Sequence, residues 1–240
     1  MKLYKSQGIV FRSTKYGESS LILDILMREK GLRSFIVGGV RKSKSKNSAA
    51  QYQHLNILDI VAYDKEDKLA RIKECNMSFY YQNLPFDIVR SSIGLFILEV
   101  CKNAIKERES NIKLYDFIYN NLLLLDQLDI SRLGLFPIKF MLDLSRHIGF
   151  EPHNNYTLKT PYFDLYNGKF TSHINEQYMA DIDSSKALSL INSTPLELLS
   201  IGDFSKPLRN KLTDDLIIFY RLHIDQFRSL KTLEVLRSIF

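Results

Sequence analysis

Cysteine and long apolar runs are scarce in this sequence. Cys75 and Cys101 are the two cysteines among 240 residues, too few for a disulfide framework or for a zinc cluster. No run approaches the roughly 18 apolar residues that a membrane-spanning helix needs, and residues 1–6 lack the apolar core of a signal peptide. We therefore expect a cytoplasmic protein that has reduced thiols and no contact with a membrane.

The patterns that usually carry catalysis are missing as well. Gly38-Gly39 lacks the Gly-Lys-Ser/Thr ending of a phosphate-binding loop, and no serine nucleophile elbow is found. A nuclease needs clustered carboxylates to hold Mg²⁺, but the acidic residues are scattered or lie in turns such as 64–67. His153 and His173 supply two of the four ligands of a closed zinc site. The sequence predicts no catalytic residue, no metal and no cofactor.

Positive charge is concentrated at the N-terminal end of the chain. Residues 1–80 contain 15 Lys or Arg and 8 Asp or Glu, which gives +7, and the other 160 residues contain 18 and 19, which gives −1. A basic cluster of Arg41, Lys42, Lys44 and Lys46 stands out, because such closely spaced cations repel one another unless a polyanion gathers them. The sequence indicates an N-terminal module that binds an anion.

Up to about residue 80 the pattern is typical of short strands. The predicted strands are residues 7–12, 21–26, 32–37, 57–63 and 69–74. Five short strands in so few residues favour a small closed barrel of the oligonucleotide-binding (OB) kind, although an SH3-like barrel or a small sandwich would give nearly the same pattern. In the fifth strand Arg71 and Lys73 alternate with Ala70 and Ile72, which predicts a basic outer stripe over an apolar inner face.

The hydrophobic period changes from two to 3.6 after residue 83. It predicts helices over about 93–104, 114–125, 133–148 and 208–220. We expect Ser91 or Ser92 to begin the first of them, and the sequence Thr194-Pro-Leu-Glu197 to begin another.

Asn167-Gly168 predicts a hairpin over residues 162–171. The expected fold is therefore α+β. A five-stranded OB barrel over residues 1–82 is followed by a helical domain over 83–240, which carries a small hairpin insertion at about 153–173.

The predicted barrel carries cations together with aromatic rings. Cations that follow a phosphate backbone, beside rings on which bases stack, are the components of single-strand binding. The candidate stacking rings are Tyr16, Phe35, Tyr52 and Tyr63. The candidate DNA contacts are Arg12, Lys15, Arg33, Arg41, Lys42, Lys44, Lys46, Arg71 and Lys73. An RNA- or ribosome-associated OB protein is an alternative, and a metal-dependent nuclease is a weaker one.

A second candidate site lies on the third predicted helix. Arg132, Lys139 and Arg146 recur every seven residues and so share one face, and Phe136 and Phe140 lie close to that row. The pattern predicts either a solvated helix face or a groove for an acidic peptide with an apolar tip.

Four N-terminal motifs resemble the RecO family of bacterial recombination mediators. In the family's order and spacing they are Gly8-Ile-Val-Phe-Arg12, Tyr16-Gly-Glu18, Glu29-Lys-Gly-Leu32 and Gly38-Gly-Val-Arg-Lys-Ser-Lys-Ser45. Residues 136–150 are similar to the family helix that ends in Leu-Gly-Phe. The resemblance implies an OB domain followed by a helical domain, and a non-enzymatic role in recombinational repair.

The resemblance also implies partners. RecO-like proteins bind single- and double-stranded DNA and anneal complementary strands. With RecR they help load a RecA-type recombinase onto DNA coated by single-strand-binding protein (SSB), whose acidic C-terminal tail they contact. Arg12, Arg41, Lys42 and Lys44 match the family motifs and are the implied DNA contacts. Residues 153–173 lack the four cysteines of the zinc module found in many members, so we expect the zinc-free type, located at the nucleoid.

Overall fold

The computed structural model describes residues 2–40, 49–64, 69–105, 109–174 and 177–239. The chain forms two compact units, one made of residues 1–82 with 105–123 and the other of residues 83–104 with 124–240. The first unit thus includes residues 105–123, which the sequence pattern assigned to the helical domain. Within the described residues, no helix has the length and apolar character to cross a bilayer.

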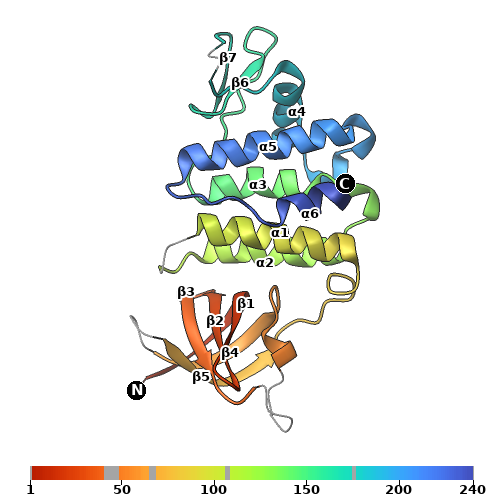
Figure 1. The fold of residues 1–240 in the computed structure, drawn as a ribbon. Coiled ribbons are helices and arrows are strands. Elements are labelled where there is room, and N and C mark those ends of the chain that lie inside the picture. The colour runs from red at the N-terminus through yellow and green to blue at the C-terminus, as the bar shows by residue number, and fades with distance from the viewer. Residues whose placement is uncertain (1, 41–48, 65–68, 106–108, 175–176, 240) are drawn as a thin grey trace. The chain divides into compact units, whose positions relative to one another are not determined.

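The first unit contains a closed five-stranded barrel (Figure 1). Its strands are β1 (Leu3–Tyr16), β2 (Ser20–Met27), β3 (Gly31–Val37), β4 (Ile57–Tyr63) and β5 (Ala70–Met77). The order around the barrel is β1-β2-β3-β5-β4, with β3 and β5 parallel and the other neighbours antiparallel. The predicted five-stranded OB barrel is confirmed.

Strand β1 closes the barrel because it is long enough to pair on both sides. Residues 3–9 pair with β4 and residues 8–16 pair with β2. The pairing with β2 shifts between Val10 and Arg12, so Phe11 is the extra residue of a β-bulge. Bulges bend a strand and reverse which of its faces the following residues occupy. The residues after Phe11 therefore alternate in the opposite sense to those before it.

Gly8 lies where β1 pairs with both neighbours. A Cβ atom at this position would lie 2.6 Å from Ile25 Cγ2 and 2.8 Å from Met27 Sδ, closer than real Cβ atoms approach other heavy atoms. Only glycine therefore lets the two strands approach at this corner without displacing the inner side chains of β2.

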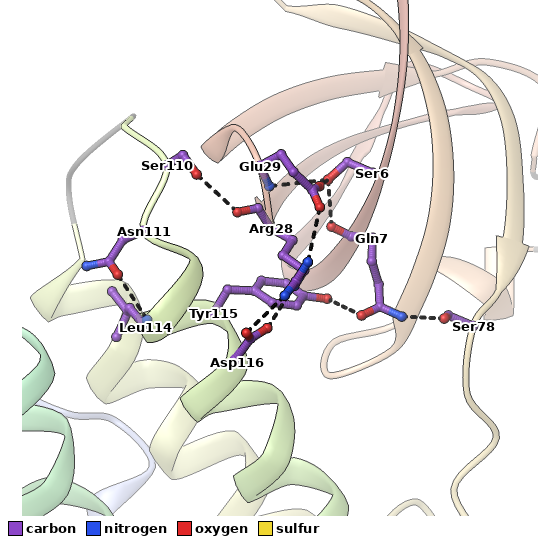
Figure 2. A network of polar contacts seen from close by, with 10 residues as sticks. All are labelled: Ser6, Gln7, Arg28, Glu29, Ser78, Ser110, Asn111, Leu114, Tyr115 and Asp116. Atoms are coloured by element: carbon purple, nitrogen blue, oxygen red, sulfur yellow. Dashed lines mark hydrogen bonds and ion pairs between the residues drawn. The ribbon is translucent and has the colours of Figure 1, made fainter.

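Residues 110–116 anchor the start of helix α2 (Ile112–Gln127) to the barrel (Figure 2). Arg28 Nε and Nη2 donate to the two carboxylate oxygens of Asp116 at 2.8 and 3.0 Å, which lowers the pKa of that carboxyl. Tyr115 Oη donates to Gln7 Oε1 at 3.1 Å, and its ring is almost fully buried. Partly exposed ion pairs contribute little to stability, so the buried Tyr115 ring provides most of the attachment.

The second unit is helical. It contains α1 (Ile88–Ala104), the end of α2, α3 (Phe136–His147), α4 (Ile182–Ser193), α5 (Lys206–His223) and α6 (Leu233–Ile239). Helix α3 packs against α1, α4 and α5, and most of its side chains are buried. The predicted hairpin is confirmed as β6 (Tyr162–Asp164) and β7 (Lys169–Thr171), with Gly168 at a φ of 64° in the turn.

Two predicted helix starts are wrong. Helix α1 begins at Ile88, ahead of Ser91 and Ser92, because Asp87 Oδ1 accepts the backbone N–H of Arg90 at 2.9 Å and caps the first turn. The segment after Thr194 forms only a three-residue 3₁₀ helix, Leu196–Leu198, without a side-chain cap. In α1 the side chain that satisfies the first free N–H groups thus decides where the helix begins.

Asp215 on α5 is a buried carboxylate. It is 6% exposed, and its Oδ2 accepts no hydrogen bond from the described residues. Lys211 Nζ lies 4.0 Å from Asp215 Oδ1 and 3.5 Å from Asp181 Oδ2, which belongs to the N-cap residue of α4. Burial raises the pKa of Asp215 to about 6, although Lys211 acts in the opposite direction.

The raised pKa predicts how stability depends on pH. The folded protein binds the proton of Asp215 more tightly than the unfolded chain does, so this group favours folding at low pH and opposes it as the pH rises through about 6. Asp215→Asn should raise the free energy of unfolding by up to about 3 kcal/mol at neutral pH and have little effect near pH 4. Denaturant titrations across this range measure the difference, with the exposed Asp183→Asn as control. Parallel pH profiles for wild type and Asp215→Asn would contradict the prediction.

Candidate nucleic-acid interface

The register of β1, β2, β3 and β5 aligns their outward side chains in two rows. Arg12, Asp24 and Ser34 form the first row across β1, β2 and β3. The second row continues to β5 and consists of Thr14, Ile22, Ile36 and Arg71. We call these seven residues the outer face. All of them are at least partly exposed, whereas the residues that alternate with them are mostly buried in the barrel core.

The polar contacts in the first row are weak enough for Arg12 to exchange them for contacts with a ligand. The Arg12 side chain is 57% exposed, and its Nη1 lies 3.9 Å from Asp24 Oδ2. Ser34 Oγ also donates to Asp24, at 2.6 Å. An exposed ion pair of this kind contributes about 0–1 kcal/mol. Arg12 can therefore leave Asp24 for a phosphate at little cost.

The predicted basic stripe on β5 is confirmed. Arg71 and Lys73 are exposed, Ala70 is buried and Ile72 is partly buried. Lys73 is the extra residue of a bulge opposite β4, and its Nζ lies 3.6 Å from Glu74. Among the residues that the structure describes, Arg71 forms no ion pair, so its charge is available to a ligand.

Two other predicted contacts lie away from the outer face. Arg33 pairs with Ile25 and so has the inward orientation of the buried Phe35. Its positive charge interacts with the Tyr4 hydroxyl. Burial raises the pKa of Tyr4 to about 12, and the charge of Arg33 partly opposes that rise. Lys15 pairs with Leu21 at one end of the barrel. The described cations thus do not form one patch. Arg12, Arg71 and Lys73 lie on or beside the outer face, Arg33 lies on the inward side of β3, and Lys15 lies at one end of the barrel.

The basic cluster of Arg41, Lys42, Lys44 and Lys46 lies outside the described residues. The chain enters this segment from Val40, which is buried in the barrel core, and leaves it at Ala49, which packs against the same core. Both ends of the segment are therefore fixed to the barrel.

The aromatic rings differ from the prediction. Phe35 and Tyr52 are fully buried in the barrel core, so neither offers a face to a base. Phe35 shares the inward orientation of Leu23, with which it pairs. Tyr16 is 55% exposed at the end of β1, and Tyr63 is partly exposed.

Residues 1–81 match the family described as Recombination protein O N terminal, and residues 85–160 match Recombination protein O C terminal. The chain is 31% identical to the DNA repair protein RecO of Christiangramia forsetii and 30% identical to that of Phocaeicola vulgatus, over 99% of each chain in both cases. The RecO of Flavobacterium johnsoniae is also 30% identical, over 98% of each chain. The chain belongs to the RecO family.

Membership of the RecO family confirms the resemblance seen in the N-terminal motifs. The proteins of this family are DNA repair mediators and not enzymes. The first family match covers the whole barrel, including the outer face, and the second begins just before α1.

The second candidate site has a different form from the predicted groove. Phe136 and Phe140 are almost fully buried, with ring centroids 6.3 Å apart, because α3 is surrounded by other helices. Lys139 Nζ lies 3.1 Å from Asp143 Oδ1, and Arg146 Nε donates to Glu151 at 2.7 Å. The two rings therefore cannot receive an apolar side chain. A peptide-binding role for Lys139, Arg146 and Arg132 stays a prediction.

The described part of the chain holds no cluster of three His, Cys, Asp or Glu residues placed to bind a metal. His153 and His173 are both exposed. Cys75 and Cys101 are buried as free thiols, and burial raises the pKa of both, that of Cys75 to about 11. Thiols with raised pKa values are poor nucleophiles.

Proposed function

We propose that this RecO-family chain binds single- and double-stranded DNA through its barrel and anneals complementary strands. In recombinational repair it then helps load the recombinase onto SSB-coated DNA. The observation that carries the proposal is the outer face, where Ile22 and Ile36 on β2 and β3 lie between Thr14 and Arg71 in one row, and Arg12 lies in the adjacent row. This is the surface that OB barrels use for oligonucleotides.

The charge of the chain supports the same proposal. Residues 1–80 carry a net charge of +7, and neutralising phosphates releases the counterions that surround DNA. The excess charge attracts a DNA strand from any direction, whereas the rows of the outer face give it a preferred path. The basic cluster at residues 41–46 follows β3 in the sequence, outside the described residues, and its charge adds to the attraction.

Family membership supports the proposed partners. RecR would act together with this chain, and the acidic tail of SSB would bring it to coated DNA in the bacterial cytoplasm, at the nucleoid. Arg132, Lys139 and Arg146 are the candidate contacts for the SSB tail. Of these, Arg146 is the most exposed, although Glu151 and Asp143 must release it first.

Arg71→Ala tests the outer face. The logarithm of the affinity for single-stranded DNA falls linearly with the logarithm of the salt concentration, with a slope of about 0.7 for each phosphate contact. Losing Arg71 should reduce the slope by about that amount, as measured by fluorescence anisotropy of a labelled strand. Arg33→Ala removes an equal charge from the inward-facing side of β3 and should leave the slope nearly unchanged. Equal slopes for wild type and Arg71→Ala, or equal losses in both variants, would contradict the assignment.

Annealing tests the mediator role. The protein should accelerate the pairing of complementary strands coated with SSB from the same bacterium, and Arg71→Ala should slow that reaction because fewer phosphates are neutralised as the strands meet. Quenching between dyes on the two strands follows the reaction. A rate equal to that without the protein would refute the proposed function, and a higher affinity for RNA than for DNA of equal length would favour an RNA-binding role.

A further inference from the structure

One end of the barrel holds a pocket separate from the outer face. It has a volume of about 230 Å³ and lies between β1, β2 and the 3₁₀ helix η1 (Ala49–Tyr52). Its floor is apolar, because Leu21 is 5% exposed, Tyr52 is fully buried and Ala49 packs against the barrel core. Pockets for drug-sized ligands measure about 300–1,000 Å³. This one therefore has room for a single ring system.

The rim of the pocket is polar and basic. Ser13 and Lys15 come from β1, and Gln53 and His54 follow η1. None of the lining residues is acidic. The side chains of Ser13, Lys15 and Gln53 form no hydrogen bond or ion pair within the described structure. Convergent polar groups above an apolar floor are the usual composition of a small ligand site.

The pocket and the outer face share strand β1. Thr14 belongs to the second row of the outer face, whereas Ser13 and Lys15 on either side of it have the opposite orientation and line the pocket. The outer face and the pocket rim thus lie on opposite faces of the same stretch of β1, so a nucleic acid strand must pass over the end of the barrel, where β1 ends at Tyr16, to reach both. The chemistry at the rim is complementary to a flat, uncharged ring attached to a phosphate.

We propose that this pocket holds one unpaired nucleobase of a bound single strand, with Lys15 contacting the neighbouring phosphate and Gln53 facing the edge of the base. The inference rests on the proposed DNA binding and names the form of DNA that the pocket takes. A base in a duplex is stacked and paired, so it does not enter. The pocket adds affinity for single strands only.

Ala49→Phe tests the pocket by filling it with a ring of the chain's own. The affinity for a single strand should fall about tenfold, because one base loses its contacts in the pocket, and the affinity for a duplex should stay unchanged. Ala50→Phe is the matched control, because Ala50 is exposed and does not line the pocket. Gln53→Ala, at an exposed position, should weaken single-strand binding in the same selective way if Ala49→Phe does not fold.

A strand of thymines with one 2-aminopurine gives a readout independent of affinity. Saturating wild-type protein should change the fluorescence of the analogue as it leaves its stacked neighbours, and Ala49→Phe should abolish that change. If wild type binds neither single nor double strands, the proposed function fails. If it binds both and Ala49→Phe changes neither the single-strand affinity nor the fluorescence, the pocket proposal alone is overturned.

Discussion

The β-bulge at Phe11 is the constraint on which the binding surfaces of the barrel depend. Before the bulge, Val10 pairs with the inward-facing Ile25, and after it Arg12 pairs with the outward-facing Asp24. Without the extra residue the alternation would turn Arg12 into the core and Ser13 outward. The bulge therefore brings Arg12 and Thr14 to the outer face and turns Ser13 and Lys15 toward the pocket. It also bends the strand so that one segment closes the barrel.

The sequence predicted most of the fold because local patterns decide it. Alternation located all five strands, the 3.6 period located α1, α2, α3 and α5 but neither α4 nor α6, and Asn167-Gly168 located the hairpin turn. Failures occurred where a partner distant in sequence decides the outcome. Residues 105–123 group with the barrel because Tyr115 and Asp116 meet residues of β1 and of the β2–β3 turn, and no pattern within the helix reports those contacts.

The candidate site was less predictable, for the same physical reason. Alternation within β5 correctly placed Arg71 and Lys73 outside, but the orientation of one strand says nothing about its neighbours. Phe35 and Arg33 lie on the inward side of β3 because of their register with β2. Two of these orientations can be read from the sequence alone. Arg33 and Phe35 are two residues apart in one strand, so their side chains must lie on the same face. Lys15 and Leu21 lie on either side of a tight turn, so they must pair across it.

The central claim is that DNA lies across β1, β2, β3 and β5 of the barrel. Photo-crosslinking tests it most directly. The protein binds a single strand that carries photoreactive thymine analogues, and the complex is irradiated. The protein is then digested, and the crosslinked peptides are identified by mass spectrometry. The account predicts crosslinks at residues 12–16, 34–37 and 71–73. Crosslinks confined to residues 124–240, with none on the barrel, would contradict it.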